Sequence, residues 1–175
     1  DNPDTMPTIA EGWDAVVLQG HSLETLRNPR GFQRAVGEFA AAALEAGATV
    51  FLYETWAREA GSSVYDETWA PGGPGPMQEA IRTVYEKAAD EFGATLLPVG
   101  TTRARFAGHH PEIPLYLRDG SHPTPQASYF AATMIFAQLF NVDPTELDYV
   151  PWGVTEQEAR LIRIAVSQET AVPQP

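Results

Sequence analysis

Thr49-Val-Phe-Leu-Tyr53 is the segment that most clearly indicates a buried strand, and the fold can be predicted outward from it. It is a short run of apolar and β-favouring residues, and it follows closely on Gly47, a residue type that commonly ends a helix. Upstream, Asn28-Pro29 is a helix start, with asparagine as the N-cap and proline at the first helical position. These signals predict a helix from Asn28 to about Ala46, followed by a buried strand.

Two similar apolar runs lie on either side of this unit, Asp14-Ala-Val-Val-Leu-Gln19 before it and Ala94-Thr-Leu-Leu-Pro98 after it. A second helix is expected from Met77 to Phe92, where Gly93 would stop it. Alternating strands and helices are typical of a parallel sheet covered by helices on both faces. We therefore expect an α/β protein with a three-layer α/β/α architecture and a flavodoxin-like sheet.

Further helices are expected towards the C-terminus. One is short, at 101–108, and one is largely buried, from Thr124-Pro125 to about Phe140. The capping box Thr155-Glu-Gln-Glu158 opens a last helix, which we expect to end near residue 167. Residues 1–12 are expected to be an irregular lead-in. Residues 57–76 are expected to form a long loop, which in a compact domain is usually functional or disordered.

The composition limits the classes of function. A chain of 175 residues, 43% hydrophobic and 19% charged, suits one soluble domain over residues 1–175. The net charge of −12 disfavours nucleic acid as a partner, and no apolar run approaches the about 18–20 residues of a membrane span. The lack of cysteine excludes disulfides and thiol catalysis. The compartment stays open, with a secreted or periplasmic location favoured over the cytoplasm.

Asp119-Gly-Ser-His122 is the strongest candidate for chemistry. In a serine hydrolase a histidine takes the proton of the nucleophile, and a carboxylate orients and stabilises that imidazole. Three residues of spacing on a tight turn can bring the carboxylate of Asp119 to one ring nitrogen of His122. Taken alone, however, the tetrapeptide is more typical of an aspartate capping a turn beside a solvated histidine.

A metal site is the less favoured alternative. Besides His122, the neighbouring pair His109-His110 could supply imidazoles. Adjacent side chains do not easily face one site, so we expect no metal and no organic cofactor.

The surroundings of Asp119 and His122 favour catalysis, because Leu115-Tyr-Leu-Arg-Asp-Gly-Ser-His-Pro-Thr124 resembles the last signature block of the SGNH (GDSL-like) hydrolases. Trp13-Asp-Ala-Val-Val-Leu-Gln-Gly-His-Ser22 looks like the third block of that family, in the form found in its carbohydrate-esterase-like branch. Leu52-Tyr-Glu-Thr-Trp-Ala-Arg58 resembles the strand that follows. Each motif is short, but they occur in the family's order and cover nearly the whole chain.

The resemblance implies a role for each matching residue. His122 and Asp119 would be catalytic, and the side-chain amide of Gln19 would stabilise the oxyanion, an effect worth roughly 3–4 kcal/mol in a transition state. Trp56 would line the substrate cleft, with His21 as a further substrate-binding residue. Arg58 would either bind a polar group of the substrate or pair with an acidic side chain, and we favour the acidic pair. The alternatives for Gln19 and Trp56 are a strand-end hydrogen bond and ordinary packing.

The nucleophile of the family is missing from its expected place. No Gly-Asp-Ser occurs in the chain, and only twelve residues precede Trp13. The favoured interpretation is that the chain is the C-terminal portion of an SGNH-like domain, without its first two strands and the serine. The fallback is that Gly20-His21-Ser22-Leu23 is itself the first block, with Ser22 as the nucleophile.

The expected function is therefore that of a serine esterase acting on small acyl esters, with O-acetylated carbohydrate as the favoured substrate. The alternative is a catalytically incomplete SGNH-like domain that binds a sugar or a peptide through Trp56 and Trp69. Loss of the first strands would expose the edge of the strand Asp14–Gln19, which is an aggregation hazard. We expect a partner chain or a second copy to cover that edge.

Overall fold

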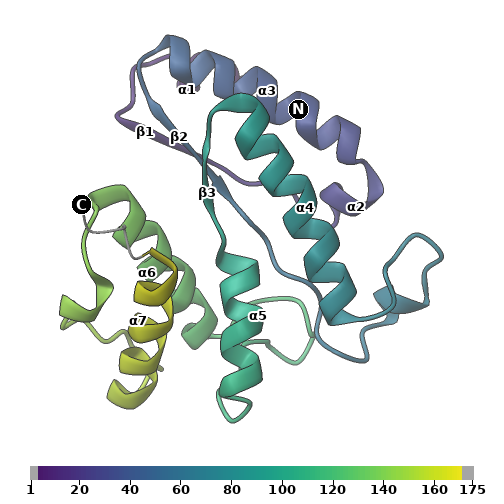
Figure 1. Ribbon diagram of the computed structural model, residues 1–175, viewed down its shortest axis with the longest axis vertical. Helices are drawn as coiled ribbons and strands as arrows, with labels where there is room; N and C mark the ends of the chain where they lie inside the picture. Colours follow the sequence, from purple (N-terminus) through teal and green to yellow (C-terminus); the bar gives the residue numbers. More distant parts are fainter. Residues whose placement is uncertain (1–3, 171–175) are drawn as a thin grey trace.

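The computed structural model describes residues 4–170, and three parallel strands lie at its centre (Figure 1). They are β1 (Ala15–Leu18), β2 (Thr49–Tyr53) and β3 (Thr95–Leu97), in the order β1-β2-β3. The register places Val17 beside Phe51 and Leu52 beside Leu96. All three strands were predicted within one residue at each end, and the three-layer α/β/α architecture is confirmed.

The helices follow the strands in the predicted alternation. Two long ones are α3 (Pro29–Glu45), with Asn28 as its N-cap, and α4 (Pro74–Phe92). The others are α5 (Val99–His109), α6 (Pro125–Phe140) and α7 (Glu156–Thr170). The capping box is present, since Glu158 N donates to Thr155 Oγ1 and Thr155 N to the Glu158 carboxylate.

Four short elements were not predicted. Residues 1–12 contain the helix α1 (Thr5–Ile9), and α2 (Glu24–Arg27) lies between β1 and α3. The 3₁₀ turns η1 (Ser63–Asp66) and η2 (Pro144–Glu146) interrupt two connections. Elements of three to five residues carry too few periods of a hydrophobic pattern for the sequence to reveal them.

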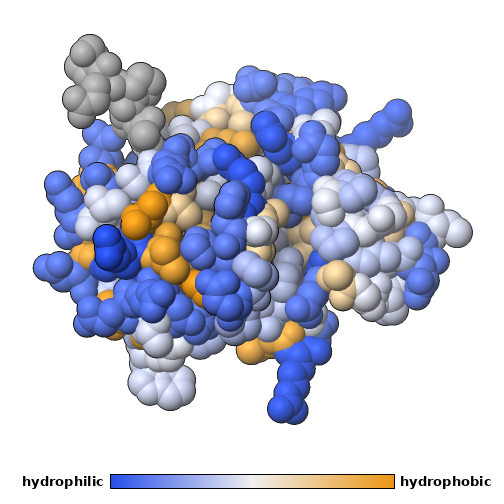
Figure 2. Space-filling model, turned by 60° about the horizontal axis from the view of Figure 1, so that its bottom comes forward, coloured by the Kyte–Doolittle hydropathy of each residue, from blue (hydrophilic) through white to orange (hydrophobic). Residues whose placement is uncertain are grey.

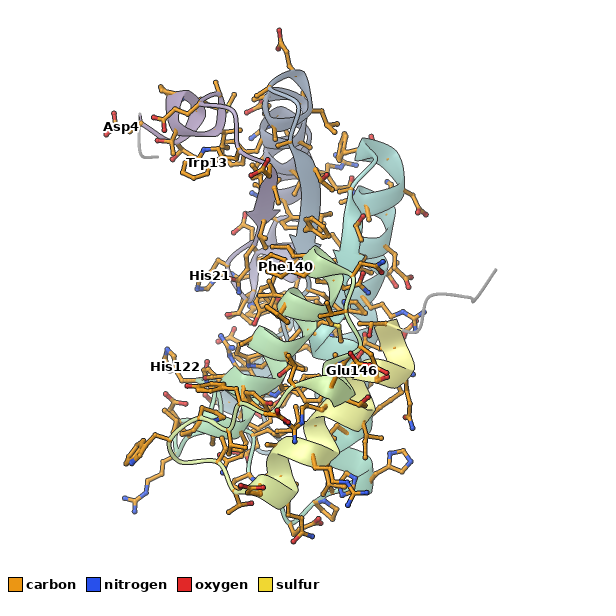
Figure 3. All side chains as sticks on the ribbon, turned by 90° about the vertical axis from the view of Figure 1, so that its left-hand side faces the viewer. Asp4, Trp13, His21, His122, Phe140 and Glu146 are labelled. Atoms are coloured by element: carbon orange, nitrogen blue, oxygen red, sulfur yellow. The ribbon has the colours of Figure 1, made fainter. Side chains whose placement is uncertain are left out.

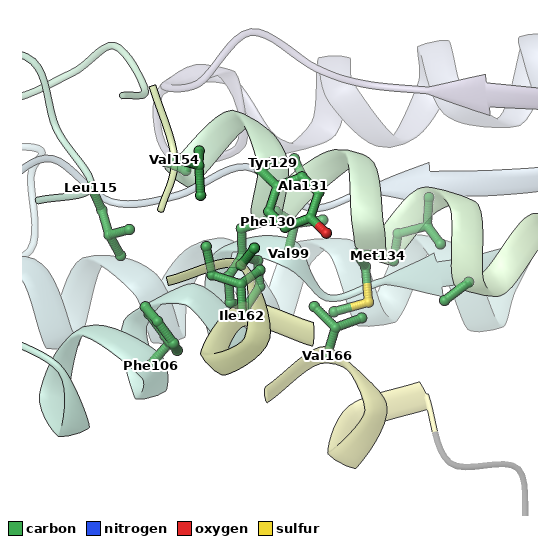
Figure 4. Close-up of a cluster of buried hydrophobic side chains, with 14 of the residues drawn as sticks. Val99, Phe106, Leu115, Tyr129, Phe130, Ala131, Met134, Val154, Ile162 and Val166 are labelled. Carbon is green, nitrogen blue, oxygen red and sulfur yellow. The ribbon is translucent and has the colours of Figure 1, made fainter. Parts of the chain in front are cut away.

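The two faces of the sheet pack against different helices. Leu52 is fully buried with residues of α3 and α4, whereas Phe51 and Tyr53 point to the opposite face and pack with α6 and α7. Alternate residues of a strand face opposite sides, so β2 is buried on both. Figure 4 shows the cluster on the α6 side, where Phe130, Met134 and Ile162 are fully buried.

The surface agrees with the composition. The face drawn in Figure 2 is mostly hydrophilic, with small hydrophobic patches between the polar side chains. Within residues 4–170, no helix combines the length and the apolarity that crossing a bilayer would require.

Candidate active site

The segment that carries Asp119 and His122 is a tight hairpin. An isolated antiparallel bridge joins Tyr116 to Pro123, and Leu117 N donates to the carbonyl oxygen of His122 at 2.9 Å. Gly120 lies at the tip with φ +63°, a left-handed conformation that glycine adopts at little cost. This turn explains how a spacing of three residues brings the two side chains together.

Asp119 and His122 form a hydrogen-bonded pair. The Asp119 Oδ2 atom lies 2.6 Å from His122 Nδ1, and Asp119 Oδ1 accepts the backbone N–H groups of Ser121 and His122, each at 2.9 Å. The hydrogen bond from the imidazole, helped by the two backbone bonds, lowers the pKa of Asp119 to about 2. The carboxylate is therefore ionised and fixed by three hydrogen bonds.

This geometry leaves one side of the imidazole available. With Nδ1 bound to Asp119, Nε2 has no hydrogen-bond partner among residues 4–170, and the His122 side chain is 73% exposed. An imidazole held by a carboxylate at one nitrogen can accept and return a proton at the other. The pair therefore has the arrangement of an acid–base unit whose Nε2 atom is available to a third group.

Residues that follow β2 are tied to this hairpin. Trp56 Nε1 donates to the carbonyl oxygen of Ser121 at 2.9 Å, and Glu59 N donates to that of Gly120 at 2.9 Å. In return, the Tyr116 hydroxyl donates to the carbonyl oxygen of Ala57 at 2.8 Å. The carboxyl end of β2 therefore positions the loop of His122, as expected for a site in a parallel sheet.

Arg58 joins a third segment to the site, in a way that the sequence did not predict. Its Nη2 atom donates to the Ser22 hydroxyl at 2.7 Å, and burial lowers the pKa of its guanidinium. The favoured pairing with an acidic side chain is wrong, because within residues 4–170 no carboxylate lies in ion-pair distance of Arg58. The reason is that Arg58 points towards the end of β1.

The remaining predicted residues follow β1. The Gln19 side chain is exposed and makes no hydrogen bond to any of residues 4–170. His21 is exposed too, and its Nδ1 accepts from Leu23 N at 3.4 Å. No hydrogen bond joins Ser22 to His122 in the described part of the chain. Figure 3 shows His21 and His122 projecting from the same side of the molecule. The oxyanion role of Gln19 stays a prediction.

Sequence reasoning missed a buried acid at the end of β2. Glu54 is fully buried, and its Oε1 accepts from Gln78 Nε2 at 2.6 Å and from Thr101 Oγ1 at 2.7 Å. Burial raises the pKa of Glu54 to about 7, although these hydrogen bonds oppose the rise. Gln78 also accepts Ala57 N at 2.8 Å, so the pair fixes the backbone before Arg58. The sequence signal that could have indicated Glu54 is an acidic residue directly after an apolar strand.

A half-enclosed cavity of about 320 Å³ lies beside the hairpin, and Trp56 lines it whereas Asp119 and His122 do not. The role of Trp56 in a substrate cleft stays a prediction. The wall of the cavity includes Arg103 from α5, which no sequence pattern had indicated.

His109 and His110 lie away from this cavity. The Nδ1 of His109 contacts the Arg105 carbonyl oxygen, and His110 contacts Glu112. Residues 4–170 contain no cluster of three or more metal-ligating side chains.

Comparisons with solved structures extend these observations. A DUF4886 family protein from Bacteroides uniformis matches with a TM-score of 0.77 and 21% identity, over 95% of this chain and 66% of its own. A candidate SGNH hydrolase from Slackia heliotrinireducens matches with a TM-score of 0.66 and 27% identity, over 78% of this chain and 70% of its own. TesA matches with a TM-score of 0.53 and 21% identity, over 77% of this chain and 67% of its own.

The chain thus spans about two thirds of the length of these structures. No protein-family model and no curated protein matches it. The chain therefore has the three-layer α/β/α fold of an SGNH hydrolase, and the likeness to the Slackia protein supports a place in that superfamily.

Proposed function

We propose that this chain supplies the acid–base pair of a serine esterase that acts on small acyl esters, with O-acetylated carbohydrate as the favoured substrate. One observation carries the proposal: His122 Nδ1 lies 2.6 Å from an Asp119 carboxylate that two backbone N–H groups also hold. That arrangement fixes the ring and leaves Nε2 free to serve a nucleophile.

In the reaction, a serine hydroxyl attacks the ester carbonyl carbon while His122 Nε2 takes its proton. Asp119 stabilises the imidazolium that forms, and Gln19, at the end of β1, would donate its amide N–H to the oxyanion. His122 then returns the proton to the departing alkoxide. Water hydrolyses the acyl-enzyme by the same path in reverse roles, releasing the acid and the free serine.

The nucleophile in this proposal lies on a segment outside these 175 residues that pairs with the free edge of β1. Two observations support it. Val17 of β1 is 40% exposed although it points to the same face as the buried Phe51, and Phe140 of α6 is 64% exposed on that side. Ser22, by contrast, accepts a hydrogen bond from Arg58 and none joins it to His122 in the described residues.

A hydrolysis assay tests the proposal. The complete gene product is expected to turn over p-nitrophenyl acetate, and His122→Ala should lower kcat about 10³-fold or more, because the general base is lost. His109→Ala is the matched control, since His109 is exposed on α5 outside the site, and it should leave kcat unchanged. Equal turnover by His122→Ala and the parent protein would refute the proposal.

The second candidate is a binding domain without catalysis. The half-enclosed cavity beside Trp56 favours it, because a cavity of this size is typical of small-molecule sites. Binding of a glycan by the complete gene product without any ester hydrolysis would support this alternative.

A further inference from the structure

The cavity of about 320 Å³ beside the His122 hairpin has an unusual wall for so acidic a protein. It lies between the residues after β2, the first turn of α4, and α5. Its lining includes two arginines, Arg58 and Arg103, but only one carboxylate, that of Glu59. These three side chains give a local charge of +1, whereas the whole chain carries −12.

Arg103 is the central feature of this wall. The residue is 2% exposed, and its guanidinium lies over two rings, 4.4 Å from the centroid of Trp56 and 4.1 Å from that of Tyr116. Its Nη2 atom donates to the Leu115 carbonyl oxygen at 2.6 Å. The other two nitrogens, Nε and Nη1, are buried and have no hydrogen-bond partner in the part of the chain that the structure describes.

The charge of Arg103 has no ion-pair partner within residues 4–170, although the Glu59 carboxylate acts on it from a longer distance. Burial lowers the pKa of its guanidinium to about 10, so the group still carries its charge at neutral pH. A buried charge without an ion-pair partner and with unused N–H donors is costly, unless a ligand supplies the missing acceptor.

The other parts of the wall complement an anion. Arg58 donates its hydrogen bond to the neutral hydroxyl of Ser22, and within residues 4–170 it forms no ion pair, although the Asp119 carboxylate acts on its charge from a longer distance. The α4 helix begins at the cavity, with Pro74 and Gly75 in the lining and Gly73 as an N-cap that offers no side chain. Pro74 and Pro76 have no N–H and Met77 N donates to the carbonyl oxygen of Gly73, so the first turn of α4 offers the N–H of Gly75 and the positive end of the helix dipole, which favours a negative ligand.

We propose that this cavity binds the carboxylate of a small organic acid, with Arg103 as its principal ligand-binding residue. A planar guanidinium matches the two oxygens of a carboxylate, and Ala57, Ala104 and Ala107 provide apolar wall for the body of the acid. A phosphate dianion fits less well, because it would exceed the local charge of +1. The proposal does not rest on the esterase function, since neither Asp119 nor His122 lines the cavity.

Isothermal titration calorimetry with matched pairs of probes tests this inference. The acids acetate, benzoate and D-glucuronate are compared with their neutral counterparts acetamide, benzamide and D-glucose, at constant chloride concentration. At least one acid should bind with 1:1 stoichiometry and at least about tenfold more tightly than its neutral partner, the range of a charged hydrogen bond. Inorganic phosphate should bind more weakly than that acid.

Variants then locate the site. Arg103→Met keeps the length of the side chain but removes the charge and donors, and should weaken binding of the acid about ten- to a hundredfold. Arg58→Gln should weaken it less, and it provides a second test if Arg103→Met does not fold. Arg105→Gln on the same helix is the control, because Arg105 is exposed and pairs with Glu169; it should bind as the parent does.

Three results would overturn the inference. They are equal affinity within all three pairs of probes, tighter binding of phosphate than of any carboxylate, and unchanged affinity in a folded Arg103→Met or, if that variant does not fold, in Arg58→Gln. Because binding is measured without turnover, failure here is distinguishable from failure of the esterase proposal.

Discussion

At the scale of single residues, the candidate site depends on how Asp119 divides its two oxygens. Oδ1 accepts two backbone N–H groups, which orient the carboxylate, and Oδ2 is left for the imidazole of His122. A carboxylate that only capped the turn would not need to face the ring. Asp119 is therefore both a turn cap and the partner of the imidazole, because the capped turn directs its carboxylate towards Nδ1 of His122.

This arrangement predicts the tautomer of His122. When neutral, the imidazole should carry its proton on Nδ1, because the Asp119 carboxylate can only accept. Asp119→Asn should weaken that preference, since an amide can also donate to Nδ1. Long-range ¹H–¹⁵N NMR measures the tautomer. His21 is the internal control: its Nδ1 accepts from Leu23 N, so its proton should lie on Nε2. An Nε2–H tautomer at His122 in the parent protein would contradict the pairing.

Glu54 predicts a pH dependence of stability. Burial raises the pKa of Glu54 from 4.5 to about 7. The folded state therefore holds a proton that the unfolded state releases between these values, and stability falls as pH rises through this window, by about 3 kcal/mol in total. Glu54→Gln removes this titration. The free energy of unfolding of the variant should therefore rise relative to that of the parent protein between pH 4.5 and 8.

Urea denaturation at several pH values measures this difference. Glu45→Gln, at an exposed position of α3, is the control and should follow the parent at every pH. A constant difference between the parent and Glu54→Gln across the pH range would show that Glu54 stays ionised in the folded protein.

Residues of the site differ in how far the sequence could predict them. Asp119 and His122 are close in sequence and meet through a local turn, so a spacing rule finds them. Arg103 and Glu54 acquire their properties from burial against residues distant in the chain, such as Trp56 and Gln78. Arg58 was assigned the wrong partner for the same reason, since Ser22 lies 36 positions away.

At the scale of elements, the close approach of α5 to the end of β2 holds the site together. Gly100 N donates to the carbonyl oxygen of Glu54, and a Cβ atom at Gly100 would overlap the carbonyl oxygen of Thr55 and lie 2.5 Å from Gln78 Nε2. Any side chain at this position would therefore push the helix away from the backbone that leads to Trp56.

Gly100→Ala should consequently destabilise the fold by about 3 kcal/mol or more, because the clash is with backbone that cannot yield. Gly108→Ala is the matched control on the same helix. A Cβ there meets nothing within 4 Å, so the change should stabilise the protein by about 0.5–1 kcal/mol through helix propensity. Thermal unfolding of both variants measures the contrast, and similar melting temperatures would contradict it.

The longer elements could be predicted because their signals are local. Asn28, Thr124 and Thr155 each accept a backbone N–H of the following helix, as their residue types indicated. The strands stood out as apolar runs between glycine and polar residues. The short helices α1 and α2 have no side-chain cap and few residues, and their stability comes from packing, of α1 on α3 and of α2 on both α3 and α4.

At the scale of the whole molecule, the sheet ends at an open edge. Among residues 4–170, β1 pairs with β2 alone, and a groove of about 260 Å³, lined by residues that include Val17, Gln19 and Phe32, runs beside it. Trp13 is 50% exposed near the start of the strand. The unpaired edge of a strand with apolar neighbours can pair readily with another strand. We propose that a partner segment or a second copy covers this edge.

Hydrogen exchange tests whether another strand covers the edge of β1. The Asp14 carbonyl oxygen accepts from Thr49 N, so Val16 and Leu18 face β2, whereas Ala15 and Val17 present their amides outward. In the soluble species all four amides should be protected. Rapid exchange at Ala15 and Val17 in a soluble monomer, with Val16 and Leu18 protected, would show that the edge is free.

Fluorophosphonate labelling of the complete gene product, with the labelled residue located by mass spectrometry, tests whether Asp119 and His122 activate a serine. We expect a label on a serine outside these 175 residues, and its loss in His122→Ala, because only an activated serine reacts. A label that persists in His122→Ala would contradict the role of the Asp119–His122 pair, and a label on Ser22 would contradict the location proposed for the nucleophile.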